Sequence, residues 1–176
     1  MSSIAPMRNH LLQAMPAAEF EALCPHLEFV ELVKEAVLVQ AGAPLTHVYL
    51  PHSGVLSLVV SLSEGQTVEV AMVGRDGVFG AAAALDGRIS LTDVVVMLPG
   101  TASILDVAHF SAAADRSGAF RTLLLRHEQA LFAQAQQSAA CNASFRSKRA
   151  CRAGYCARAT CATARTCRRP RNSWRK

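Results

Sequence analysis

The sequence predicts a mainly β fold with flanking helices, in which a roll or sandwich of short strands is followed by one long helix. Short apolar segments recur between residues 27 and 106 and are separated by turn signals rich in Gly, Pro, Ser and Asp. Apolar residues recur at helical spacing between residues 9 and 26. Residues 119–142 contain no glycine or proline, which favours a single long helix.

Length and composition are consistent with one main domain and an appendage. A domain of about 100 to 150 residues can bury a core, and the chain has 176 residues. Its longest apolar runs, such as Val78 to Leu85, are shorter than the roughly 18 to 20 residues of a membrane-spanning helix. The start, MSSIAPMRNH, lacks the pattern of a signal peptide. We therefore expect a cytoplasmic protein with no membrane partner.

The net charge of +5 combines two oppositely charged parts of the chain. All 13 acidic residues but only 7 of the 18 Lys and Arg residues lie in residues 1–144, which carry a net charge of −6. Residues 145–176 hold the other 11 basic residues, no acid, and four of the six cysteines. In a reducing cytosol these cysteines are expected to be thiols.

The N-terminal part is expected to form two short helices and then a series of strands. Asn9 is a favourable N-cap type, and Pro16 divides the helical pattern into two helices. Strands are then expected at residues 27–40, 47–50, 55–62 and 67–73. The expected turns between them lie at residues 41–44, at Ser53-Gly54 and at residues 63–66.

The stretch VEVAMVGRDGVFG, from Val68 to Gly80, is the first candidate for a sensing site because it joins a strand to a glycine-rich turn. The run of alanines that follows it favours a helical turn over a strand. Next, residues 91–98 and 102–110 are expected to form a strand pair around Pro99-Gly100. Asp106 is placed to cap a short helix after this pair.

The long helix has a weak heptad pattern that favours dimerisation. Leu124, Leu131 and Ser138 repeat every seven residues, and other residues lie near the same face. The predicted dimer interface consists of Phe120, Leu124, His127, Leu131, Ala135 and Ser138. The alternative is a helix that packs only on the sheet of its own chain.

Three segments together resemble the sensor half of the Crp/Fnr family of bacterial transcription regulators. They are LLQAMPAAEFEALCPHLE, VLVQAGAPLTHVYLPHSGVLSLV and VEVAMVGRDGVFGAAAALDG, and the resemblance covers about residues 9–144. It implies a cyclic-nucleotide-binding-type double-stranded β-helix (jelly roll) in residues 1–116 and a dimerisation helix in residues 117–144. In the family a C-terminal helix-turn-helix then binds DNA.

The resemblance also implies a pocket whose polar contacts are missing. Nucleotide-binding members hold the cyclic phosphate with a short helix N-terminus, a glutamate after Phe-Gly and an arginine before the next strand. Here Ala81 stands at the glutamate position, and the arginine position falls near Ser90. The implied pocket, for an unknown small-molecule effector, comprises Val78, Phe79, Gly80, Ala81, Arg88 and Thr92.

Other sensing and catalytic chemistries find little support in the sequence. An iron–sulfur cluster would need several N-terminal cysteines, and only Cys24 is there. Candidate haem ligands by residue type are His47, His52 and His109, although a lone histidine is more often structural. Gly-x-Ser-x-Gly, His-Glu-x-x-His and Walker patterns are absent. We therefore expect no cofactor, no metal and no enzymatic activity.

Three interpretations are open for residues 145–176. A basic disordered arm would bind nucleic acid non-specifically, and the four cysteines could bind zinc, although their spacing is not that of Cys-x-x-Cys pairs. The third interpretation is a frameshift, because codons can be chosen so that another frame encodes an amphipathic helix. The predicted function is the sensor and dimerisation portion of a Crp/Fnr-like regulator; the alternative is a stand-alone effector-binding or protein-interaction module.

Overall fold

The computed structural model describes residues 8–63, 65–85 and 89–152, with side chains as far as residue 143. The chain divides into two compact units, Met1–Ala135 and Gln136–Lys176. The division falls inside the long helix, which the sequence assigned to residues 117–144. None of the described helices is long and apolar enough to cross a membrane.

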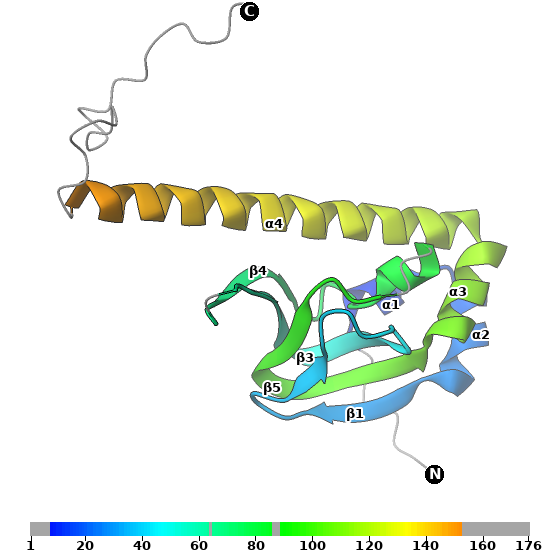
Figure 1. Ribbon diagram of the computed structural model, residues 1–176. Coiled ribbons are helices and arrows are strands. Elements are labelled where there is room, and N and C mark those ends of the chain that lie inside the picture. Colours follow the sequence, from blue (N-terminus) through cyan, green and yellow to red (C-terminus); the bar gives the residue numbers. More distant parts are fainter. Residues whose placement is uncertain (1–7, 64, 86–88, 153–176) are drawn as a thin grey trace, which may run out of the picture. The chain divides into compact units, whose positions relative to one another are not determined.

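The first unit is built on one antiparallel five-stranded sheet, which confirms the predicted mainly β fold with flanking helices and a long C-terminal helix (Figure 1). The strand order is β1-β5-β3-β4, and β2 also pairs with β5. The strands are β1 (Glu28–Leu32), β2 (Val37–Val39), β3 (His47–Ser61), β4 (Thr67–Val73) and β5 (Asp93–Asp106). The helices are α1 (His10–Ala14), α2 (Ala17–Leu23), η1 (Cys24–His26), η2 (Ala81–Leu85), α3 (Val107–Arg116) and α4 (Gly118–Arg152).

Two of the predicted turns are instead bends within long paired strands. Ser53-Gly54 lies inside β3, and Pro99-Gly100 lies inside β5, where the register between the two strands shifts. Gly54 has a φ of +81°, and a Cβ there would lie 2.6 Å from the carbonyl oxygen of Leu98. Because neither glycine has a side chain, the two backbones can approach closely at this point while both strands bend. The sequence pattern had indicated that each strand ends here.

The predicted helix caps are confirmed, and Asn9 does more than cap α1. Its side-chain oxygen accepts from the backbone N–H of Leu12 at 3.0 Å, while its amide nitrogen donates to the carbonyls of Pro51 and Gly77. Asn9 is fully buried, so all these bonds form away from solvent. It thereby ties the first helix to β3 and to the glycine-rich turn before Val78. Asp106 caps α3 by accepting from the N–H of Ala108 at 2.7 Å.

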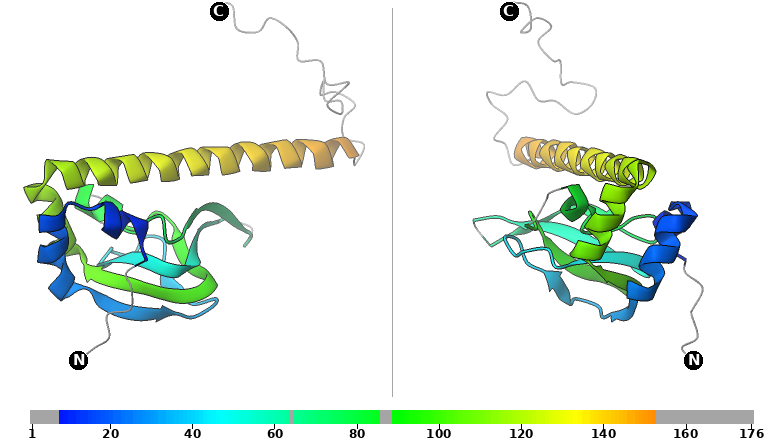
Figure 2. Two further views of the ribbon diagram at one scale, coloured as in Figure 1. Left: turned by 180° about the vertical axis from the view of Figure 1, so that it is seen from behind. Right: turned by 90° about the vertical axis from the view of Figure 1, so that its right-hand side faces the viewer.

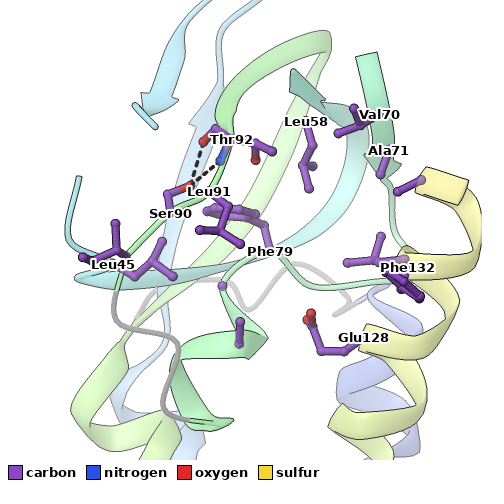
Figure 3. Close-up of a pocket in the computed structure, with 15 residues that line it drawn as sticks. Leu45, Leu58, Val70, Ala71, Phe79, Ser90, Leu91, Thr92, Glu128 and Phe132 are labelled. Atoms are coloured by element: carbon purple, nitrogen blue, oxygen red, sulfur yellow. Dashed lines mark hydrogen bonds between the residues drawn. The ribbon is translucent and has the colours of Figure 1, made fainter. Parts of the chain in front are cut away.

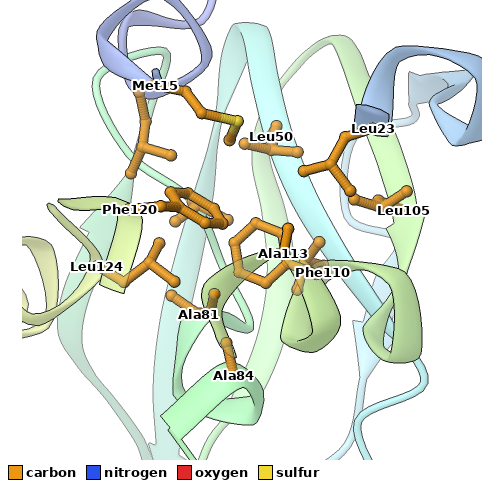
Figure 4. Close-up of a cluster of buried hydrophobic side chains, with 14 of the residues drawn as sticks. Met15, Leu23, Leu50, Ala81, Ala84, Leu105, Phe110, Ala113, Phe120 and Leu124 are labelled. Atoms are coloured by element: carbon orange, nitrogen blue, oxygen red, sulfur yellow. The ribbon is translucent and has the colours of Figure 1, made fainter. Parts of the chain in front are cut away.

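The α-helices α1 to α4, the short helix η2 and the sheet enclose the larger apolar cluster, at the end of the sheet where α2 and α3 lie side by side (Figures 2 and 4). Phe110 of α3 meets Phe120 of α4 edge to face, with ring centroids 5.3 Å apart. Leu124, one turn further along α4, is also fully buried here. The smaller cluster lies within the roll formed by strands β1 to β5, where Leu56, Val94 and their neighbours pack with Phe79.

This packing corrects part of the predicted dimer interface. Phe120 and Leu124 have no exposed surface because they belong to the core of their own chain, so neither can contact a partner in this conformation. His127 bonds to the roll and Leu131 packs against the smaller cluster. The apolar stripe of residues 118–135 therefore matches the alternative interpretation, a helix packed on its own sheet. Ser138 is half-buried and belongs to the second unit.

Candidate functional site

The first unit contains a cavity of about 780 Å³ between the roll and α4 (Figure 3). Strands β3 and β4 contribute Leu58 and Val70, and the segment leading into β5 contributes Ile89, Ser90, Leu91 and Thr92. Helix α4 contributes Glu128, Leu131, Phe132 and Ala135. The other lining residues are Leu45, Ala71, Phe79, Gly80 and Ala82. This volume lies in the usual range of small-molecule sites.

Half of the predicted pocket residues line this cavity. Phe79, Gly80 and Thr92 border it. Val78 and Ala81 do not, because both are fully buried in the larger apolar cluster. Arg88 lies outside the described residues.

The turn after β4 is held against β3 on one side and α4 on the other. Phe79 and Tyr49 exchange two backbone hydrogen bonds of 2.9 Å, and their rings are tilted at a centroid distance of 6.2 Å. Burial raises the pKa of Tyr49. Gly80 has a φ of +92° and passes close to Val48, so a side chain there would be strained. The lining position of Phe79 thus follows from the backbone pairing of its segment.

His127 connects α4 to the same turn. Its Nε2 accepts from the backbone N–H of Val78 at 3.1 Å. A Cβ on Gly77 would lie 2.7 Å from that nitrogen, so a side chain at residue 77 would displace the His127 ring from its present position. Because Nε2 accepts, the ring proton of this neutral imidazole lies on Nδ1. Nδ1 faces Glu128, whose Oε1 is 3.6 Å away.

The polar groups of Ser90, in the cavity wall formed by the segment before β5, hydrogen-bond to other residues of the chain. The Ser90 hydroxyl donates to the carbonyl oxygen of Thr92 at 2.7 Å, and Ser90 is nearly fully buried. The Ser90 backbone N–H and carbonyl pair with Ala43 and Gly42. This wall therefore offers few free donors to a ligand, and the position implied for the phosphate-binding arginine is filled by a hydroxyl that bonds to its own chain.

Sequence reasoning missed the helix wall as a binding surface. It assigned Leu131 and Ala135 to a dimer interface, and it did not consider Glu128 or Phe132. One available signal was that Glu128 is the single acidic residue in residues 118–152. The contributions of Leu45, Leu58 and Val70 had no such signal, because apolar strand residues are common in any roll.

The three histidines considered as haem ligands are not among the residues that line the cavity. His47 is within hydrogen-bond distance of Thr46, and His109 stacks on His26 at 3.9 Å. His52 is buried, pairs with Ser103 at 2.8 Å and stacks on Phe29. Burial lowers the pKa of His52. Among the described residues no group of three or more His, Cys, Asp or Glu side chains could hold a metal ion.

A protein-family profile matches the strand-rich part of the chain. The sequence profile of the cyclic nucleotide-binding domain matches residues 29–117. A comparison with curated proteins gives no match.

Similar solved structures include both kinase subunits and transcription regulators. The regulatory subunit of a cAMP-independent protein kinase A from Trypanosoma brucei has a TM-score of 0.60 at 20% identity, covering 70% of this chain and 44% of its own. The sensor domain of the transcriptional regulator DNR from Pseudomonas aeruginosa has a TM-score of 0.58 at 18% identity, covering 69% and 81%. The N-terminal domain of a transcriptional regulator from Streptomyces coelicolor has a TM-score of 0.54 at 19% identity, covering 73% and 91%. The chain thus spans less than half of the kinase subunit. At sequence identities this low, the TM-scores show a shared fold alone.

Proposed function

The chain belongs to the cyclic nucleotide-binding domain family, and from this premise we propose that it is the sensor and dimerisation portion of a Crp/Fnr-like transcription regulator. In this proposal a small-molecule effector binds in the cavity between the roll and α4, in the cytoplasm, and the protein has a regulatory rather than a catalytic role. The chain covers most of the DNR sensor domain and of the N-terminal domain of the Streptomyces coelicolor regulator but less than half of the kinase subunit, and this coverage supports the choice.

The observation that carries the proposal is that α4 forms one wall of the cavity. Glu128, Leu131, Phe132 and Ala135 line it, and the neighbouring His127 bonds to the turn that precedes Phe79. A ligand in this cavity would therefore contact the roll and the helix together. Any difference in affinity between two helix positions would shift the equilibrium between them.

Dimerisation through α4 remains part of the proposal, but on a different face from the predicted one. Leu125 is 46% exposed and is not among the residues that line the cavity. Leucine is a typical contact residue between paired helices. In sedimentation equilibrium, Leu125→Glu should weaken self-association, whereas Ala130→Glu, at another exposed position of the same helix, should not. An unchanged association constant for both would contradict a dimer formed on this face.

For the output, we propose that the intact regulator binds DNA through a helix-turn-helix encoded in another frame beyond residues 142–145. The support for this frameshift is that codons can be chosen for residues 145–176 so that another frame encodes an amphipathic helix. Sequencing the gene should reveal a frame that continues into an amphipathic helix and a helix-turn-helix. If no frame does so, the frameshift is wrong and the stand-alone module is favoured.

DNA binding then separates a regulator from that module. The protein expressed from the joined frames should retain a fragment from upstream of its own gene at about 200 mM salt, whereas an unrelated fragment should be released, because non-specific phosphate binding weakens steeply with salt. Equal release of both fragments would contradict the regulator.

A further inference from the structure

The family implies a cyclic nucleotide, so the charges around the cavity decide whether an anionic phosphate fits there. Among the lining residues that the structure describes, Glu128 is the single charged side chain, and it is acidic. A carboxylate repels a phosphate at short range. The lining position near the expected arginine is Ser90, whose hydroxyl donates to the carbonyl of Thr92. The described residues do not fit a cyclic phosphate.

The negative charge of Glu128 is not balanced by its neighbour. His127 accepts from Val78 through Nε2, so the ring is neutral and offers Nδ1–H at 3.6 Å from Glu128 rather than a positive charge. The Glu128 side chain is 32% exposed, and Figure 3 shows it on α4 at the border of the cavity. A bound cation would therefore find a carboxylate that has no cationic side chain beside it among the described lining residues.

The rest of the cavity favours an apolar molecule. Large aliphatic or aromatic side chains line it from the roll and from the helix. Three of them remain in contact with water: Leu91 is 88% exposed, Phe132 65% and Ile89 55%. A ligand that covers these side chains would remove apolar surface from water, which is the main driving force for binding in such pockets.

We propose that this pocket binds an apolar small molecule that carries one ammonium-type cation, which Glu128 accepts. This inference rests on the proposed sensor function and names the ligand class of its cavity. The apolar part of the ligand lies among Leu58, Val70, Phe79 and Leu91, and the cationic group lies beside α4.

The test uses a pair of competitors with the same ten-carbon chain and opposite charges. The full-length protein is titrated with the neutral fluorophore N-phenyl-1-naphthylamine, and decylammonium, decanoate and cAMP are each added as competitors below their micelle concentrations. Decylammonium should displace the fluorophore at about tenfold lower concentration than decanoate, and cAMP should not displace it. Glu128→Gln should reduce the preference for decylammonium to about twofold or less.

Two matched controls test whether the cavity is the site. Glu21→Gln removes a carboxylate from α2, outside the cavity lining, and should leave the preference unchanged. Ala135→Trp places a large side chain at the helix wall and should abolish fluorophore binding, whereas Ala133→Trp, at an exposed position of the same helix, should not. Circular dichroism checks that each variant is folded.

The outcomes separate this inference from the sensor function. Binding of cAMP that is lost in Arg88→Gln would overturn the inference and leave the sensor function intact. Equal displacement by the two ten-carbon chains, or a preference that survives Glu128→Gln, would overturn the role of Glu128. Failure of the fluorophore and of every competitor to bind would overturn both the ligand class and the cavity as an effector site.

Discussion

Helix α4 contributes to two apolar regions of the same unit, and these regions differ in how completely they are packed. At its start, Phe120 and Leu124 are fully buried against α3 and the sheet (Figure 4). Further along, Leu131 and Phe132 border a cavity of about 780 Å³ (Figure 3). Because residues 118–135 are anchored by the first region, the second can remain open to solvent without loss of the fold. One helix thus contributes to stability in its first turns and to a binding wall in the next.

The largest expected effect comes from the closed region. Phe120→Ala should lower the free energy of unfolding by about 3–5 kcal/mol, because it removes a fully buried ring and leaves a cavity beside Phe110. Leu131→Ala, in the open region, should cost only about 1–2 kcal/mol, because Leu131 is half-buried. Urea denaturation followed by circular dichroism measures both. Equal losses would remove the distinction between the two regions.

An intermediate effect is expected at the bond between the helix and the turn. His127→Leu leaves the N–H of Val78 without its acceptor and should cost about 1–3 kcal/mol. His127→Gln can place an oxygen near the former Nε2 and should recover part of that loss. Amide hydrogen exchange reads the bond directly: exchange at Val78 should accelerate in His127→Leu.

The amide of Phe79 provides the internal reference for this experiment. It donates to the carbonyl of Tyr49 at 2.9 Å, and this bond does not involve α4. If the two amides accelerate equally, the substitution loosens the whole turn rather than the bond to His127.

The smallest effect on stability is expected at the mouth of the cavity. Phe132→Ser should change the free energy of unfolding by less than about 0.5 kcal/mol, because the side chain is 65% exposed. It should nevertheless weaken binding of N-phenyl-1-naphthylamine about fivefold, since the ring covers part of the ligand. Unchanged fluorophore affinity would indicate that Phe132 is only a surface residue.

Much of the fold was predictable because its signals are local. Asn9 and Asp106 are short polar side chains that cap the helices directly after them, and Pro16 separates two helices by its own chemistry. The bends at Gly54 and Gly100 were read as turns, since a glycine in a turn and a glycine at a close approach of two strands look alike in sequence. Which of the two it is depends on the partner strand.

The candidate site was predictable only in part, for the same reason. Phe79 and Gly80 could be identified because a turn signal and a resemblance coincide there, whereas Val78 and Ala81 point into the core instead. Glu128 and Phe132 were missed because a helix displays the same periodicity whether its stripe faces its own sheet, a cavity or a second copy.

By itself, the sequence determined the mainly β architecture, the helix caps and the separation of an acidic body from a basic tail, because propensity, periodicity and charge are properties of neighbouring residues. Only the tertiary structure decided that Phe120 and Leu124 are core, that His127 bonds to Val78, and that Glu128 is the charged group at an apolar cavity. Those facts depend on contacts between segments that are far apart in the sequence; His127 and Val78, for example, are 49 residues apart. A pattern of neighbouring residues does not show which distant segments will be in contact.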